Sequence, residues 1–429
     1  MEQWEERLIQ YHKLFLRYPE PGWMTFFATI YLAESLQKAG YEVYVGREIT
    51  DSELPADEQQ LEVYERLAFK FAREAGVEEP EEWTRRLGHR TGVIAILDTH
   101  RVGEVKAFRF CMDKVDQAAL TGQLYLPSGG KLAGGYSVML HTGGHMALGL
   151  ALACGLAEER SALSGKFIFV FQPADAGGRG EFSFTQDWKY GHIDKLYCSR
   201  VGFCPKYDTV GTSGDFSFVA GARGFLAASR MDVQYMGRPP RTISGTDPGR
   251  NALLAASAAV LLMEEVELPR DGLTRLNVGR LQAGESRSTI PTEAWMQMEI
   301  CGETLEKNRQ VGIQVLRSIS QAARRFDVDY RIVFRGESIS AASDERLAAK
   351  VIEKALDVGG FRRYLSTWVY GTSDDGAAFL DMVQKDGGLA TYMLFTVEGP
   401  TMQRGSENTM LEQLLRKAYQ VLYKAAVEI

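Results

Sequence analysis

Five side chains in the first half of the chain carry groups that bind metals or move protons. They are one thiol, two imidazoles and two carboxylates: Cys111, Asp113, His141, His145 and Asp175. Zinc takes thiolate, imidazole and carboxylate ligands in proteins. The spacing of these residues matches no recognised zinc motif, so the sequence allows a metal site here without specifying its ligands.

A second combination is a thiol close to a cation. Cys198 lies two residues before Arg200, and a nearby positive charge favours the thiolate form of a cysteine. This pair leaves metal-free acyl transfer by a cysteine nucleophile as one open alternative.

Apolar strands and a helix must position these residues. Residues 91–99, 104–112 and 166–174 read as strands, and residues 145–159 as a helix. The continuous apolar run of the third strand is typical of a sheet covered on both faces. We therefore predict a three-layer α/β domain with functional loops at the carboxyl ends of its strands.

The N-terminal part of the chain has its own pattern. Residues 2–17 and 22–39 are expected to be helices, followed by a strand over 41–49. Residues 51–90 are charged and helical, which favours a surface insertion over a core element.

A smaller α+β unit interrupts the α/β pattern. Its order is β-α-β-β-α-β, which is the ferredoxin-like arrangement, with strands and helices expected at 230–237, 251–268, 274–284, 293–302, 310–326 and 328–336. A strand at 389–397 and a helix at 410–426 then return to the first pattern. The predicted division is 1–223 and 339–429 for the α/β domain, and 224–338 for the inserted domain.

Composition restricts the function classes. The chain has 429 residues, 45% hydrophobic and 24% charged, with a formal net charge of -7, which is a globular profile that argues against nucleic-acid binding. The N-terminal segment is too charged for a signal peptide, and no apolar run is long enough for a membrane span. Five cysteines without regular spacing favour a reducing, cytoplasmic location.

Several segments, in this order along the chain, together resemble the bacterial aminobenzoyl-glutamate hydrolase A-type subunits of the aminoacylase and carboxypeptidase superfamily. They are LAESLQKAGYEVYVGREI, GVIAILDT, FIFVFQPADAG, GRNALLAASAAV, RLNVGRLQAGESRSTIP and GTSDDGAAFL. The resemblance implies a zinc-peptidase-like catalytic domain with an inserted dimerisation or lid domain. It also implies amide-bond hydrolysis at a metal site, and a homodimer or a heterodimer with a related chain.

The same resemblance places unusual residues in the first part of the metal site. Members of this family use an H-x-C-G-H-D-G-H loop; ungapped matching puts Leu140 at its Cys ligand, Thr142 at its His ligand and His145 at its trailing His. A gapped alignment restores His145 as a ligand but sets a glycine in place of the Cys. In the Q-P-A-E-E-G loop, Asp175 takes the general-base position and Ala176 a ligand position.

Arginine takes the later histidine positions. Arg200 and Arg404 match the two remaining ligand histidines, Arg241 the lid-domain histidine near the reacting carbonyl, and Arg250 a further histidine. Cys111 replaces the first Asp of a strand-end motif that keeps Asp113. A guanidinium has no lone pair to donate, so it cannot bind zinc.

These substitutions lead to our main hypothesis. Each alone has an ordinary interpretation: a surface arginine, a helix N-cap at Asp175, a packed histidine at His145. Together they predict a metal-free protein without zinc-dependent hydrolysis, in which guanidiniums bind a small carboxylate-bearing ligand. The predicted ligand-binding residues are Arg200, Arg241, Arg404, His145, Asp113 and Cys111, with Asp175 at the base position. The main alternative is an active amidohydrolase with a rebuilt zinc or manganese site.

Overall fold

The structure is a computed structural model of the chain. It describes residues 3–18, 20, 22–49, 58–112, 135–173, 184–185, 188–203, 215–239, 249–397 and 407–429, with only the backbone for 58–60, 135–142, 203 and 407–409.

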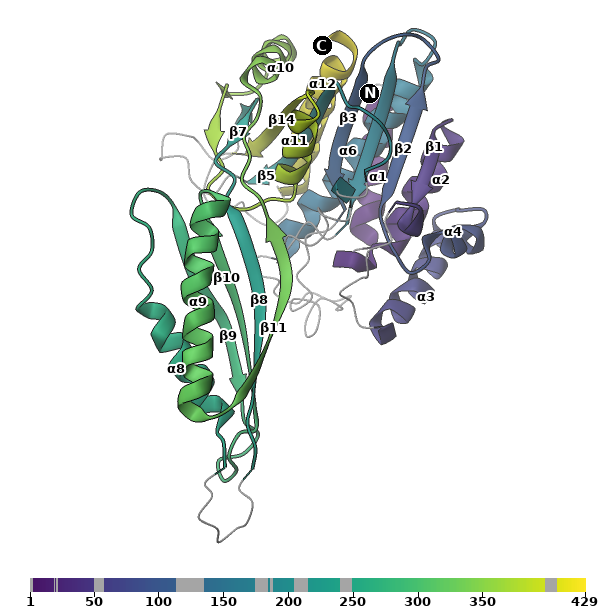
Figure 1. The fold of residues 1–429 in the computed structure, drawn as a ribbon. Helices are drawn as coiled ribbons and strands as arrows, with labels where there is room; N and C mark the ends of the chain where they lie inside the picture. Colours follow the sequence, from purple (N-terminus) through teal and green to yellow (C-terminus); the bar gives the residue numbers. More distant parts are fainter. Residues whose placement is uncertain are drawn as a thin grey trace.

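An eight-stranded sheet forms the centre of the larger domain (Figure 1), with strand order β1-β2-β4-β3-β5-β14-β6-β12. Its strands are β1 (Glu42–Val45), β2 (Val93–Asp98), β3 (Val105–Cys111), β4 (Lys166–Gln172), β5 (Lys195–Phe203), β6 (Phe216–Val219), β12 (Arg363–Leu365) and β14 (Leu389–Val397). The four central strands β4, β3, β5 and β14 are parallel. Their carboxyl ends therefore meet at one edge of the sheet, where ligands bind in open α/β sheets.

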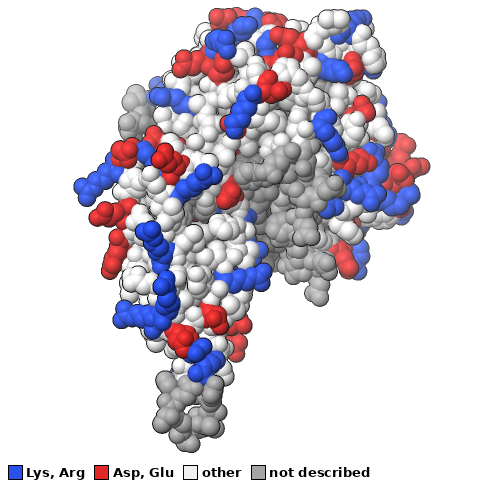
Figure 2. Space-filling view, viewed as in Figure 1, with Lys and Arg blue, Asp and Glu red and all other residues white. Residues whose placement is uncertain are grey.

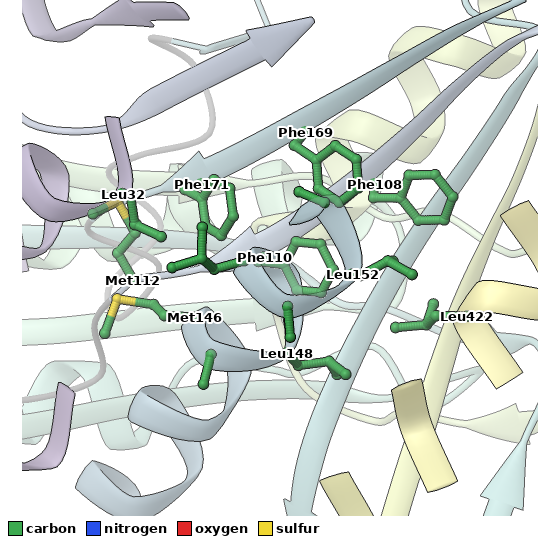
Figure 3. Packing of buried hydrophobic residues seen from close by; sticks show 14 of the residues in the cluster. Leu32, Phe108, Phe110, Met112, Met146, Leu148, Leu152, Phe169, Phe171 and Leu422 are labelled. Carbon is green, nitrogen blue, oxygen red and sulfur yellow. The ribbon is translucent and has the colours of Figure 1, made fainter. Parts of the chain in front are cut away.

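Helices cover both faces of this sheet. The first face packs against α1 (Gln3–Arg17), α2 (Phe26–Lys38), α6 (Gly135–Glu158), α10 (Glu345–Val358) and α12 (Glu407–Glu428). Figure 3 shows part of this core, in which Phe108 and Phe110 of β3 and Phe169 and Phe171 of β4 lie close to Leu148 and Leu152 of α6. The opposite face packs against α11 (Gly376–Lys385). The predicted three-layer α/β domain is confirmed.

The expectation of a surface insertion over residues 51–90 is wrong for its helices. Both α3 (Glu58–Glu74) and α4 (Pro80–Leu87) contribute to the main core through Ala68, Ala72 and Trp83, which are buried. The charged residues of these helices occupy only their outer faces, so each helix is amphipathic.

The inserted domain has the predicted ferredoxin-like order. Its sheet is β11-β8-β10-β9, covered on one face by two helices, and it projects from the larger domain (Figure 1). The elements are β8 (Ala227–Met236), α8 (Ala252–Glu264), β9 (Thr274–Ala283), β10 (Glu293–Gly302), α9 (Leu305–Phe326) and β11 (Asp329–Ser338). The side chains of Asn251 and Thr304 cap the first turns of α8 and α9.

The distribution of surface charge and the hydropathy of the helices agree with the globular profile that the composition predicts. On the face in Figure 2, basic and acidic side chains are interspersed over both domains. Within the described ranges, no helix combines the length and the apolar character that crossing a bilayer requires.

The buried carboxylate of Glu20 caps α2, and it makes the stability of the folded protein depend on pH. Glu20 accepts hydrogen bonds from the backbone N–H groups of Phe27 (2.7 Å) and Ala28 (2.8 Å), and burial raises its pKa to about 8. The folded protein then holds a proton between about pH 4.5 and 8 that the unfolded chain has lost, so stability falls as the pH rises through this window, by at most about 1.4 kcal/mol per unit. In urea titrations from pH 5 to 8, Glu20→Gln should remove this decline; an identical decline in the variant would contradict the assignment.

Candidate functional site

The candidate site lies at the carboxyl edge of the central parallel strands. Cys111 ends β3 and pairs in register with Gln172 at the end of β4, while Arg200 of β5 lies opposite Leu394 of β14. Of the predicted site residues, the structure brings Cys111, Arg200 and His145 to this edge. The others lie outside the described residues: Asp113, Asp175, Arg241 and Arg404.

Strand alternation divides the site between the two faces of the sheet. Successive residues of a strand point to opposite faces. Ser199 accordingly contacts His145 of α6 on one face, and Arg200 contacts Asp374, just before α11, on the other. Arg109 and Gln172 point to the same face as Arg200, because Arg109 contacts Gln172 and lies near Asp374.

His145 is buried and fastens α6 to the sheet. Its Nδ1 accepts the backbone N–H of Cys111 at 3.0 Å, and its Nε2 lies 3.0 Å from the Ser199 hydroxyl oxygen. Because Nδ1 is an acceptor, the proton of a neutral ring is on Nε2, which donates to Ser199. In this arrangement neither nitrogen is available to a metal, and His145 cannot take a proton from Ser199. Its predicted role in ligand binding stays a prediction.

Replacing His145 with phenylalanine should lower the free energy of unfolding by about 1–3 kcal/mol, because the Cys111 N–H and the Ser199 hydroxyl lose a buried partner. Urea denaturation measures this loss. The matched control is His192→Phe, since His192 is exposed and pairs with Asp386; it should change stability by no more than about 0.5 kcal/mol. Equal effects of the two substitutions would contradict the structural role of His145.

Arg109 lies in the middle of an apolar strand and is completely buried. Its Nε and Nη2 donate to the side-chain oxygen of Gln172 at 2.8 and 2.7 Å, and its Nη1 donates to the Cys111 sulfur at 3.2 Å. Its Nη1 also lies 3.6 Å from Asp374 Oδ1, and Gln172 donates to Asp375 at 2.7 Å. Burial of a charge is tolerated when it is paired and hydrogen-bonded, as it is here.

Asp374 is the centre of the second half of this network. Its Oδ2 accepts a hydrogen bond from Arg200 Nη1 at 2.5 Å, from the Tyr392 hydroxyl at 2.9 Å and from the Tyr370 hydroxyl at 3.0 Å. Arg200 also donates to the Tyr370 oxygen, and the Gly376 N–H donates to Asp374 Oδ1 at 2.9 Å. Burial, and then the charge of Asp374, raise the pKa of Tyr392, so its hydroxyl stays a donor.

The network combines equal numbers of basic and acidic groups. The basic groups are the guanidiniums of Arg109 and Arg200, and the acidic groups are the carboxyls of Asp374 and Asp375. Arg200 is the one arginine of the two that reaches the surface, with 32% of its side chain exposed, against 0% for Arg109. We call these four residues, with Gln172, the arginine–aspartate network.

Most ligand positions of the metal site that the resemblance implies have no described side chain: Leu140, Thr142, Ala176 and Arg404. Among the described residues no group of three or more histidine, cysteine or acidic side chains is arranged to hold a cation. Of the candidate residues that the structure describes, the Cys111 sulfur accepts a hydrogen bond from Arg109 and both nitrogens of His145 are engaged. Arg200, which the resemblance matches to a ligand histidine, has no lone pair.

Cys198 is an unfavourable nucleophile in this fold. It lies opposite Arg109 on the neighbouring strand and is completely buried in the core beneath α11. A nucleophile must reach its substrate, so this burial argues against acyl transfer at Cys198. Arg250, which the resemblance matches to another family histidine, pairs with Asp327 of the inserted domain at 2.5 Å.

Comparison with known proteins decides the family. No protein-family model matches the sequence. The chain is 30% identical over 392 residues, 90% of both chains, to a Haemophilus influenzae homologue of the A-type subunit of p-aminobenzoyl-glutamate hydrolase. The chain belongs to the family of aminobenzoyl-glutamate hydrolase A-type subunits. The resemblance inferred from the sequence is thereby confirmed.

Further members and neighbours of this family agree. The indole-3-acetyl-aspartic acid hydrolase of Enterobacter agglomerans is 31% identical, covering 91% of this chain and 88% of its own. A crystal structure of an aminobenzoyl-glutamate utilization protein from Klebsiella pneumoniae superposes with a TM-score of 0.81 at 28% identity, covering 99% and 96% of the two chains. A dinuclear metal-binding peptidase of the M20 family from Bacillus subtilis shares the fold, with a TM-score of 0.60 at 17% identity, covering 100% and 99%.

Proposed function

We propose that this family member binds an N-acyl amino acid through its carboxylate and does not cleave it by a zinc-dependent mechanism. The observation that carries the proposal is that Asp374 and Tyr370 hold Arg200 at the carboxyl edge of the sheet. The sequence resemblance matches this arginine to a ligand histidine of the family. The relatives hydrolyse aminobenzoyl-glutamate and indole-acetyl-aspartate according to their names, so an acidic N-acyl amino acid is the proposed ligand class.

The chemistry of the ligand positions supports the absence of zinc hydrolysis. Zinc hydrolases need several protein ligands around the metal and a base within reach of the attacking water. By alignment this chain has Leu140, Thr142, Ala176, Arg200 and Arg404 at ligand positions. Leucine, alanine and arginine have no donor atom for a metal, and we derive no catalytic step through one.

Arg200 supports carboxylate binding because it is already oriented. Its Nη1 is fixed by Asp374 and Tyr370, so little side-chain entropy is lost on binding. Since the arginine–aspartate network contains as many acidic as basic groups, we infer that further positive charge for the ligand comes from elsewhere. We propose that Arg404 and Arg241 supply it, as the sequence predicts.

The proposed function also includes a cellular location and an oligomeric state for the chain. We propose that the chain acts in the cytoplasm as a homodimer, or as a non-catalytic partner of a related chain. The intact pattern of the inserted domain, with its four-stranded sheet and two helices, supports a preserved dimerisation surface.

Calorimetry with p-aminobenzoyl-glutamate, in the presence of a chelator, tests the proposal. We expect saturable binding by the metal-free protein and no release of p-aminobenzoate, with or without added zinc or manganese. An absence of binding would refute ligand recognition. Turnover that appears with a stoichiometric metal would refute the metal-free mechanism and favour the alternative, an active amidohydrolase rebuilt from Cys111, Asp113, His141, His145 and Asp175.

A further inference from the structure

The two connections between the domains lie side by side, next to one short segment of the larger domain. The connection into the inserted domain follows β7 (Ala222–Arg223), and the connection out of it includes Ser343, whose N–H donates to the Ala222 oxygen at 3.0 Å. Beside them β13 (Trp368–Val369) pairs with β7. The chain then continues as Tyr370–Asp374, which we call the junction segment.

Backbone hydrogen bonds attach the junction segment to the connection that enters the inserted domain. The N–H of Tyr370 donates to the Arg223 oxygen at 2.7 Å, and the N–H of Gly371 to the Gly224 oxygen at 3.1 Å. The N–H of Leu226 donates back to the Thr372 oxygen at 3.0 Å. The junction segment is thus hydrogen-bonded to this connection along three successive residues. It ends at Asp374, whose carboxylate binds Arg200.

Two side chains of the inserted domain reach this segment. Arg275 of β9 donates to the Gly371 backbone oxygen at 3.4 Å, and a second arginine makes a shorter hydrogen bond next to Asp374. Arg230 of β8 donates from Nη2 to the Ser373 hydroxyl oxygen at 2.9 Å. Its Nε lies 2.7 Å from Glu299 Oε2 on the neighbouring strand β10, where the two residues pair in register. Glu299 therefore holds the Arg230 guanidinium against the sheet of the inserted domain through Nε. Through Nη2, the same guanidinium restrains the Ser373 hydroxyl.

We infer that Arg230 is a positioning residue: through Ser373 it ties the orientation of the inserted domain to the Asp374 carboxylate, and so to the ligand-binding arginine Arg200. This inference rests on the proposed function for its ligand. Its structural half, that Arg230 restrains the junction segment, is independent of any ligand.

The physical reason is the shortness of the connection. Ser373 and Asp374 are adjacent, and Asp374 uses both carboxylate oxygens on described partners: Arg200, Tyr370, Tyr392 and the Gly376 N–H. A displacement of Ser373 by a fraction of an ångström changes the Asp374 geometry, and hydrogen bonds weaken steeply with misalignment. A shift of the inserted domain therefore changes the position of the Arg200 guanidinium.

The chain offers a matched control for this test. Arg335 of β11 belongs to the same sheet and pairs with Asp232 at 2.7 Å, as Arg230 pairs with Glu299, and its hydrogen bond stays within the inserted domain. Arg230→Met and Arg335→Met thus remove one arginine and one ion pair each, but only the first removes a hydrogen bond to the junction segment. Arg230→Lys keeps a cation that can donate to Ser373.

Calorimetry with p-aminobenzoyl-glutamate measures the functional half. We expect Arg230→Met to weaken binding about fivefold, the worth of one hydrogen bond, while Arg335→Met stays within about twofold and Arg230→Lys recovers most of the affinity. If the wild type binds and Arg230→Met has the affinity of Arg335→Met, the inference is overturned.

Hydrogen–deuterium exchange measures the structural half without a ligand. Arg230→Met should accelerate exchange of the Gly371 and Gly376 amides, whereas Arg335→Met should not. If the wild type does not bind the probe, the proposed function fails, and the exchange result alone decides: faster exchange specific to Arg230→Met supports the inference, and equal exchange in both variants overturns it.

Discussion

Replacing Arg109 with methionine is expected to lower the free energy of unfolding by about 3–5 kcal/mol, because it removes one member of a buried, paired set of charges. Arg109 is completely buried and makes three hydrogen bonds, two to Gln172 and one to Cys111. Methionine fills most of the same volume, so the loss comes from leaving Asp374 and Gln172 without this cation. Urea or guanidinium denaturation of the full chain measures the change.

The matched control is Arg280→Met on the exposed strand β9. Arg280 is exposed and bonds Gln282 at 2.7 Å, so its replacement should cost no more than about 0.5 kcal/mol. If Arg109→Met also lowered the free energy of unfolding by no more than about 0.5 kcal/mol, the buried network would contribute nothing to stability. That result would contradict our interpretation.

Replacing Arg200 with alanine is expected to weaken binding of p-aminobenzoyl-glutamate about 10- to 100-fold, which corresponds to about 1.5–3 kcal/mol for hydrogen bonds to a charged group. The variant should remain folded, since Asp374 keeps its bonds from Tyr370, Tyr392 and the Gly376 amide. Calorimetry gives the affinity, and thermal unfolding verifies the fold. The double substitution of Arg200 and Arg404 should abolish binding.

Arg160→Ala controls for the loss of one positive charge. Arg160 donates to the Asp98 backbone oxygen, and Asp98 pairs in register with Lys166, the first residue of β4. It therefore lies at the opposite end of the sheet and should leave the affinity unchanged. Equal affinities of the Arg200 and Arg160 variants would remove Arg200 from the ligand site.

Much of the fold could be predicted because hydrophobic periodicity carries it. The six elements of the inserted domain follow from alternating strands and amphipathic helices, and the apolar runs of β2, β3 and β4 identify the central sheet. The strand β5 was not predicted, although it lies between β3 and β14 and carries Arg200. The polar residues Ser199 and Arg200 interrupt its apolar pattern. Their place in a buried strand is understood only from their partners, His145 on one face of the sheet and Asp374 on the other.

The helix α6 shows a similar limit. The sequence predicts its start near His145, because the family resemblance places a ligand loop before it. In the structure the helix backbone begins at Gly135, so Leu140 and Thr142 belong to a helix. Local preference of glycine against helix is weak compared with tertiary packing.

The arginine–aspartate network was largely missed by sequence reasoning, which named only Arg200 among its charged members. One signal was present in the sequence. Arg109 interrupts an otherwise apolar strand, and a charge in a buried strand requires a partner. Asp374 and Asp375 directly precede α11, but nothing in their spacing showed that they face two arginines from β3 and β5.

Elemental analysis of the purified full-length chain, before and after incubation with zinc or manganese, tests the central claim most directly. Our account predicts no stoichiometric metal in either sample, because it proposes that Arg200, bonded to Asp374, replaces a ligand histidine of the family. One or two equivalents of zinc or manganese bound per chain, and lost on addition of a chelator, would contradict it.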